Sequence, residues 1–120
     1  MLFINYKKCS TCQKARKFLE QKGVVFEDRQ IKEQNPTAEE LAEWLKKSGL
    51  AAKKFFNTSG MLYREMGLKD RLPEMSEPEM LELLATDGML VKRPLLVTDE
   101  TVLVGFKEAE WENIFLRFGK

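Results

Sequence analysis

The sequence predicts an α/β fold in which a helical insertion divides a four-stranded mixed sheet into two halves. A strand, a helix and a second strand follow one another at the start of the chain. Several helical stretches come next, and two strands joined by a tight turn precede a final helix. A strand–helix–strand unit favours parallel pairing with a right-handed crossover, whereas strands joined by a tight turn pair antiparallel.

The first half begins with residues 2–6, LFINY, a short apolar and aromatic run typical of a buried strand. Residues 10–22 have helical periodicity, and Gly23 is expected to end that helix. Its apolar face carries Cys12, Ala15, Phe18 and Leu19. Residues 24–31, VVFEDRQI, are predicted to form the second strand.

A helical insertion is predicted over about residues 36–88. Thr37 and Glu40 form a capping box at the start of its first helix. The apolar stripe of that helix is Leu41, Trp44 and Leu45. Residues 50–60 are expected to form a connection with two buried aromatic side chains, and residues 61–67 a short helix.

The last helix of the insertion is predicted over residues 76–88. Ser76 and Glu79 have the spacing of a second capping box. Pro78 is tolerated because it falls in the first turn, and Gly88 is expected to end the helix.

The second half covers about residues 89–120. Residues 94–106 are predicted to form two strands around a tight Asp-Glu turn. The final helix carries an apolar stripe of Trp111, Ile114, Phe115 and Phe118. With about residues 1–35 as the first half, this order predicts a thioredoxin-like fold in one domain spanning 1–120.

Composition excludes several classes of function. The chain has 120 residues, of which 43% are hydrophobic and 32% charged, an ordinary globular balance. Its formal net charge of +1 gives no field that would attract nucleic acid or a membrane surface. No apolar run is long enough to span a bilayer, and the N-terminus lacks a signal-peptide pattern. We therefore expect a cytoplasmic monomer.

Histidine is absent from the chain. This excludes Ser/His and Cys/His catalysis and removes the commonest metal ligand. Lysine, arginine, carboxylates and the backbone must therefore support any thiol chemistry.

Both cysteines of the chain, Cys9 and Cys12, lie at the predicted start of the first helix. Unpaired N–H groups and the positive end of the helix dipole stabilise an anion there. Basic residues close in sequence add to this effect: Lys7, Lys8, Lys14, Arg16 and Lys17. We therefore expect the pKa of Cys9 to lie well below its free value of about 8.5, and Cys12, on the inward face, to stay protonated.

This asymmetry suits two-step thiol–disulfide exchange. The thiolate of Cys9 attacks a disulfide or another electrophile, and Cys12 then attacks the Cys9 sulfur and releases the product. The spacing brings the two sulfurs close enough to bridge. Three other interpretations stay open: a structural zinc site, which normally needs four ligands, a pair of unreactive cysteines, and lysines that form only a solvated surface.

Arg93 followed by Pro94 is a second signal. Proline at the first residue of a strand removes no ladder donor. In thioredoxin folds the proline at this place is cis and lies against the cysteines, so Pro94 is expected to shape a substrate groove. A proline that merely starts a strand is the alternative.

Four blocks of sequence resemble the ArsC/Spx family of arsenate reductase-like proteins: CSTCQKARKFL, NTSGMLYREMGL, VKRPLLV and VGFKEAEW. The resemblance runs over nearly the whole chain and implies that Cys9 is the nucleophile. Cys12 matches the second cysteine of Spx-type proteins, and Arg93 matches the arginine before the family's proline. Asn57 and Lys107 stand where arsenate reductases carry two further arginines.

The two departures predict weak arsenate reduction, because an arginine fork holds an oxyanion better than a lysine or an uncharged asparagine. The candidate catalytic residues are Cys9 and Cys12. The candidate substrate-binding residues are Lys8, Asn57, Arg93, Pro94 and Lys107.

Three functions are compatible with these residues and with the resemblance. The first is an arsenate reductase-like thiol–disulfide oxidoreductase with glutathione, glutaredoxin or thioredoxin as its electron donor and no bound cofactor or metal. The second is an Spx-like redox switch that regulates transcription by binding the C-terminal domain of the RNA polymerase α subunit. The third is a true glutathione- and glutaredoxin-dependent arsenate reductase.

Overall fold

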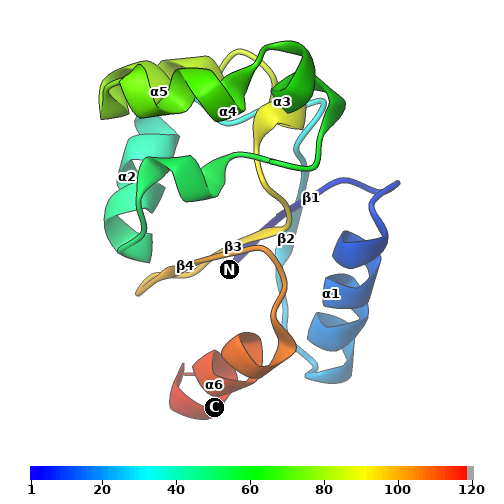
Figure 1. The fold of residues 1–120 in the computed structure, drawn as a ribbon. Helices are drawn as coiled ribbons and strands as arrows, with labels where there is room; N and C mark the ends of the chain where they lie inside the picture. Colours follow the sequence, from blue (N-terminus) through cyan, green and yellow to red (C-terminus); the bar gives the residue numbers. More distant parts are fainter. Residues whose placement is uncertain (119–120) are drawn as a thin grey trace.

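A computed structural model describes residues 1–118 and contains one four-stranded sheet in the order β2-β1-β3-β4 (Figure 1). The strands are β1 (Leu2–Asn5), β2 (Glu27–Gln30), β3 (Leu95–Val97) and β4 (Val102–Val104). β1 pairs in parallel with β2 and antiparallel with β3, and β3 pairs antiparallel with β4. The predicted mixed sheet and thioredoxin-like fold are therefore confirmed.

One face of the sheet is covered by α1 (Ser10–Gln21) and α6 (Glu108–Phe118), as Figure 1 shows. The residues buried between them are mostly aromatic and include Phe3, Phe18, Trp111 and Phe115. Trp111 is fully buried, and its indole N–H donates to the carbonyl of Gly105 at 3.1 Å. The side chain of Phe118, predicted for the same stripe, lies outside the described residues.

The opposite face is covered by the segment between β2 and β3 (Figure 1). Its helices are α2 (Ala38–Ser48), α3 (Met61–Glu65), α4 (Leu68–Arg71) and α5 (Glu77–Leu84), with short 3₁₀ turns η1 (Ala52–Phe55), η2 (Leu72–Glu74) and η3 (Gly88–Leu90). The core here is mainly aliphatic, although Phe55 and Phe56 are buried in it as expected. None of the helices described between residues 1 and 118 is long and apolar enough to cross a membrane.

Two predicted boundaries were wrong. The second strand begins at Glu27 instead of residue 24, because the chain leaves Gly23 with a positive φ of 68° and Val25 stays 90% exposed. The helix expected to end at Gly88 ends at Leu84. Gly88 is instead buried at the start of η3, where it has a packing role.

Gly88 lies against the carbonyl group of Ile31, the residue that follows β2. A Cβ at position 88 would stand 2.0 Å from that oxygen, which only glycine avoids. The side-chain amide of Asn35 also donates to the carbonyl of Ala85 at 2.7 Å. The insertion therefore returns to the point at which it left the sheet.

Candidate active site

Cys9 is the N-cap residue of α1. The chain leaves β1 through a turn in which the Cys9 N–H donates to the carbonyl of Tyr6 at 2.9 Å. The Sγ of Cys9 accepts a hydrogen bond from the backbone N–H of Cys12 at 3.4 Å. The first turn of the helix contains no acidic residue, so the helix end presents its positive potential to sulfur alone.

The pKa of Cys9 lies below its ordinary value. Partial burial raises this pKa, but several favourable interactions with the thiolate outweigh the effect of burial. The thiol and backbone N–H of Cys12 and the backbone N–H of Thr11 donate hydrogen bonds, and the charge of Arg93 adds a Coulombic attraction. These are the interactions expected to activate a cysteine at a helix N-terminus.

Cys12 has the opposite character. Its residue is only 2% exposed, and burial raises the pKa of its thiol to about 12. The neighbouring Cys9 sulfur raises that pKa further, whereas a backbone hydrogen bond at Tyr6 lowers it. The pair therefore combines a partly exposed cysteine whose pKa is lowered with a buried cysteine whose pKa is raised, one helical turn apart, as the sequence predicted.

Arg93 contributes a cation that has unused hydrogen-bonding capacity. Its guanidinium lies over the ring of Tyr6, with 5.2 Å from Cζ to the ring centroid. Its Nε and Nη1 are buried without a hydrogen-bond partner among the described residues. Buried unpaired donors are costly, so this side chain is suited to an acceptor that enters from outside. The peptide bond between Arg93 and Pro94 is cis.

A cleft of about 260 Å³ opens beside Arg93. Asn57 and Lys107, two other predicted binding residues, line the same cleft together with Thr11 from the first helix. Sequence reasoning missed Thr58, Ser59 and Lys92, which also line it. Small hydroxyl residues in a connection give no periodic signal, so their place at the cleft follows only from the fold.

The connection that carries Asn57 is fixed to the segment that carries Arg93. Asn57 donates its N–H to the carbonyl of Leu90 at 2.8 Å, and Lys92 donates to the carbonyl of Phe55 at 2.7 Å. An antiparallel bridge joins Phe56 to Val91 between these bonds. This pairing places a piece of the insertion next to the redox pair.

Two predicted binding residues have different surroundings. Lys8 is exposed and Pro94 is buried, and neither of them lines the cleft. The prediction that sequence neighbours would supply the positive charge needs correction as well. Arg93, distant in sequence, is the cation whose charge lowers the pKa of Cys9, because the nearby lysines extend into solvent.

Arg16, another of those neighbours, is occupied elsewhere. Its Nη2 lies 2.5 Å from Asp28 Oδ2 and 3.3 Å from Asn5 Oδ1. Asn5 is 1% exposed, donates to Asp28 and accepts from Gln30. Burial raises the pKa of Asp28, but its hydrogen bonds from Arg16, Asn5 and Gln30 prevail and hold the pKa below its usual value. This network ties α1 to β1 and β2, and so fixes the helix that carries the cysteines.

The described residues include no group of three or more Asp, Glu, Cys or His side chains arranged to hold a metal ion.

Several known proteins are similar to this chain in sequence. A sequence model of the ArsC family matches residues 4–114. The curated protein YusI of Bacillus subtilis is 56% identical over 94% of this chain and 96% of its own length. The global transcriptional regulator Spx 2 of Oceanobacillus iheyensis is 29% identical over 83% of this chain and 73% of the regulator.

Solved structures agree with this result. An ArsC family related protein from Bacteroides fragilis has a TM-score of 0.92 and 55% identity, covering 94% of this chain and 95% of that one. A possible arsenate reductase from Streptococcus mutans has a TM-score of 0.84 and 43% identity, covering 92% and 96%. Since the family match spans most of the sequence and the fold agrees throughout, the chain belongs to the ArsC family.

Proposed function

We propose that this chain is a thiol–disulfide oxidoreductase of the arsenate reductase-like type, with Cys9 as nucleophile and Cys12 as resolving thiol. One observation carries the proposal: the sulfur of Cys9 caps α1 with a lowered pKa, while the thiol of Cys12 is buried with a raised pKa. The pKa values of the two thiols are thus shifted in opposite directions although the cysteines share one helical turn.

In the first step the Cys9 thiolate attacks one sulfur of a substrate disulfide. A new S–S bond forms between Cys9 and that sulfur, the substrate S–S bond breaks, and the other half leaves as a thiolate. The Cys9 side chain has then lost its negative charge. Two of the causes that raise the pKa of Cys12, the charge of Cys9 and the hydrogen bond to it, disappear at that moment.

In the second step Cys12 gives up its proton to the departing half of the substrate, and its sulfur attacks Sγ of Cys9. The mixed disulfide breaks, the second half of the substrate leaves as a thiol, and a Cys9–Cys12 disulfide remains. Two electrons have moved to the substrate. A thiol donor of the glutathione, glutaredoxin or thioredoxin class must reduce the pair before another cycle.

The cleft beside Arg93 is proposed to hold an anionic part of the substrate. Arg93 lines the cleft and has two buried donors without a partner among the described residues, and Lys107 and Asn57 lie on the same walls. A single guanidinium with the ammonium groups of Lys92 and Lys107 holds an oxyanion less firmly than several arginine forks. Pro94 shapes the base of this region, and Lys8 adds positive charge from outside it. Arsenate-dependent consumption of reductant is accordingly expected to be weak.

Trapping of mixed disulfides tests the assignment. Cys9→Ser is expected to abolish covalent capture of a small aromatic disulfide, because the remaining sulfur is buried and protonated. Cys12→Ser is expected to make the captured species accumulate, because it removes the resolving thiol. Mass spectrometry of both variants measures the adduct. Equal accumulation in the two variants would refute the assigned roles.

A second function is supported by the relatives that are named global transcriptional regulators, such as the Spx 2 protein. On this alternative the same cysteine pair would act as a switch, and its oxidation would change the affinity for the C-terminal domain of the RNA polymerase α subunit. Purified α-subunit domain and oxidised or reduced protein can be compared by calorimetry. Redox-dependent binding without catalytic turnover would favour the regulator over the oxidoreductase.

A further inference from the structure

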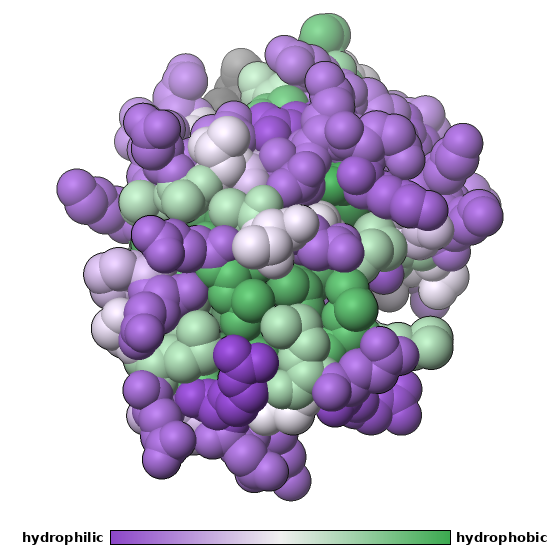
Figure 2. All heavy atoms as spheres, turned by 90° about the horizontal axis from the view of Figure 1, so that it is seen from above, coloured by the Kyte–Doolittle hydropathy of each residue, from purple (hydrophilic) through white to green (hydrophobic). Residues whose placement is uncertain are grey.

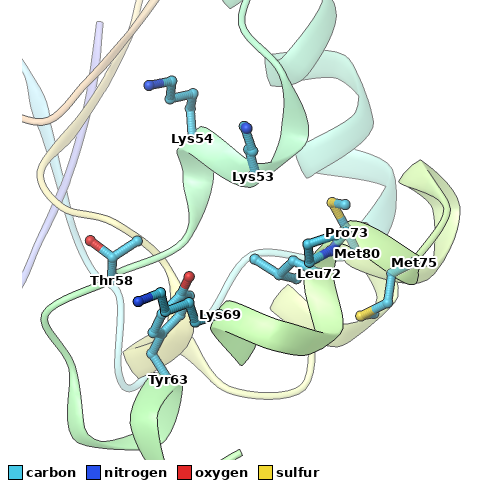
Figure 3. A pocket seen from close by; sticks show the side chains of 9 residues that line it. All are labelled: Lys53, Lys54, Thr58, Tyr63, Lys69, Leu72, Pro73, Met75 and Met80. Carbon is cyan, nitrogen blue, oxygen red and sulfur yellow. The ribbon is translucent and has the colours of Figure 1, made fainter. Parts of the chain in front are cut away.

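A groove of about 480 Å³ lies on the helical insertion, away from the cysteines in sequence. Figure 3 shows Lys53 and Lys54 extending from η1 on one side, with apolar side chains across the hollow. Leu72, Met75 and Met80 form the apolar wall. Methionine side chains are flexible and polarisable, so such a wall adapts to differently shaped apolar groups.

The groove has an uncompensated positive rim. Lys53, Lys54 and Lys69 line it, and no acidic residue does. Within residues 1–118 none of these three lysines forms an ion pair. The hollow between α1 and α6 differs, because Glu108 and Glu112 line it together with its lysines. The groove therefore favours an anionic occupant with an apolar part.

The groove adjoins the cleft beside Arg93 at one residue. Thr58 lines both of them. On the other side of the cleft stand Arg93, whose charge lowers the pKa of Cys9, and Thr11, whose N–H also lowers it. A chain that lies in the groove and extends past Thr58 thus meets the cleft that Arg93 and Thr11 line.

The face that carries α3, α4 and α5 also combines apolar and charged surface, over a larger area than the groove. Figure 2 shows hydrophobic atoms gathered in the middle of this face, with hydrophilic atoms around them. An apolar centre with a charged border is the usual composition of a surface that binds another protein.

We infer that the substrate of Cys9 is a protein disulfide flanked by a segment that combines carboxylates with apolar side chains, and that this segment binds in the groove. The reaction of this disulfide with Cys9 rests on the proposed function, whereas binding of the segment in the groove does not. A small disulfide can fill the cleft of about 260 Å³ alone. Only a longer substrate also reaches the groove, where the lysines meet its carboxylates and the methionines its apolar side chains.

Binding is tested first, without any sulfur chemistry. A short synthetic peptide of alternating Glu and Leu residues, with serine in place of cysteine and a fluorescent label, is titrated with the protein and followed by anisotropy. We expect saturable binding that weakens about tenfold or more when Lys53, Lys54 and Lys69 are all replaced by Glu. The matched control variant carries the same change to Glu at the exposed Lys17, Lys32 and Lys46. These lysines lie outside the groove, so the control should bind the peptide like the wild type.

Three outcomes would overturn the binding claim. The first is that the control triple variant weakens peptide binding as much as the groove triple variant does. The second is that a peptide with lysine in place of every glutamate binds the wild type as tightly as the original peptide. The third is complete displacement of the peptide by equimolar octanoate. The last would assign the groove to a small amphipathic anion. Circular dichroism confirms that each variant is folded, so loss of binding is not confused with unfolding.

Reactivity is tested next, in the Cys12→Ser background. The same peptide, now with one cysteine as a mixed disulfide with thionitrobenzoate, is compared with the small symmetrical disulfide of thionitrobenzoate. We expect the ratio of the two rates to favour the peptide and to fall about tenfold in the groove triple variant. No reaction of either compound would refute the proposed function, whereas reaction of both at an unchanged ratio would refute only the groove.

Discussion

The start of α1 and the starts of α2 and α5 satisfy the same backbone groups with different chemistry. Thr37 and Ser76 accept hydrogen bonds through hydroxyl oxygens, and Glu40 and Glu79 complete a capping box at each helix. At α1 the acceptor is the sulfur of Cys9, at 3.4 Å from the donor nitrogen, and no carboxylate follows it in the first turn.

This difference separates stability from reactivity. Carboxylates in the first turn stabilise a helix because they offset its positive end. At α2 the hydrogen bond from Arg29 is the main reason that the pKa of Glu40 falls to about 2, so this carboxylate stays ionised. At α1 no carboxylate of the first turn offsets the positive end of the helix. This positive potential therefore stabilises the thiolate of Cys9, the ionised form that attacks a disulfide.

The largest expected effect comes from Arg93, which reinforces the positive end of α1. Arg93→Gln removes a charge that lowers the pKa of Cys9. The thiolate fraction at neutral pH then falls, and the rate of alkylation by iodoacetamide should drop on the order of tenfold. The midpoint of the rate against pH should move to higher pH. The charge-conserving variant Arg93→Lys should lose less, and an unchanged midpoint in Arg93→Gln would show that the helix end acts alone.

The hydroxyl caps provide the next test. Thr37→Ala removes the acceptor for the Glu40 N–H and is expected to lower the free energy of unfolding by about 1 kcal/mol. Cys9→Ser should leave that free energy unchanged or slightly higher, since a hydroxyl caps a helix well. Urea denaturation of both variants measures this. A larger loss in Cys9→Ser than in Thr37→Ala would mean that the sulfur is a structural cap.

The smallest effect should come from adding the missing carboxylate to α1. Ser10 is exposed at the first position of the helix. Ser10→Asp is expected to raise the free energy of unfolding by about 0.3–1 kcal/mol while it slows alkylation of Cys9, because the new charge repels the thiolate. The neutral variant Ser10→Asn should slow alkylation less. A gain in both stability and reactivity would contradict the separation of the two properties at this helix.

Local chemistry explains what the sequence predicted well. The capping boxes at Thr37 and Ser76 involve residues three apart, and Cys9 becomes the N-cap of α1 after the short turn that follows β1. These features depend only on near neighbours. The parallel β1–β2 pair and the antiparallel β3–β4 pair follow similarly from general rules on crossovers and hairpins.

Contacts between distant residues explain what could not be predicted. Arg93 lowers the pKa of Cys9 because β3 lies beside β1. The sequence instead predicted this effect for lysines close to Cys9 in the chain, which in fact face solvent. The helices α4 and η2 are too short for a periodic signal, and they form around the buried Leu68 and Leu72. The groove depends on those helices, so it became visible only in the structure.

The contact between Gly88 and the Ile31 carbonyl has a consequence for divergence within the family. Because the chain leaves β2 and returns to β3 at one place, insertions or deletions in between leave the spacing of the strands unaltered. The segment between these two residues can therefore change in length without altering the sheet. A side chain at position 88 would force the Ile31 carbonyl away and separate the two ends of the insertion.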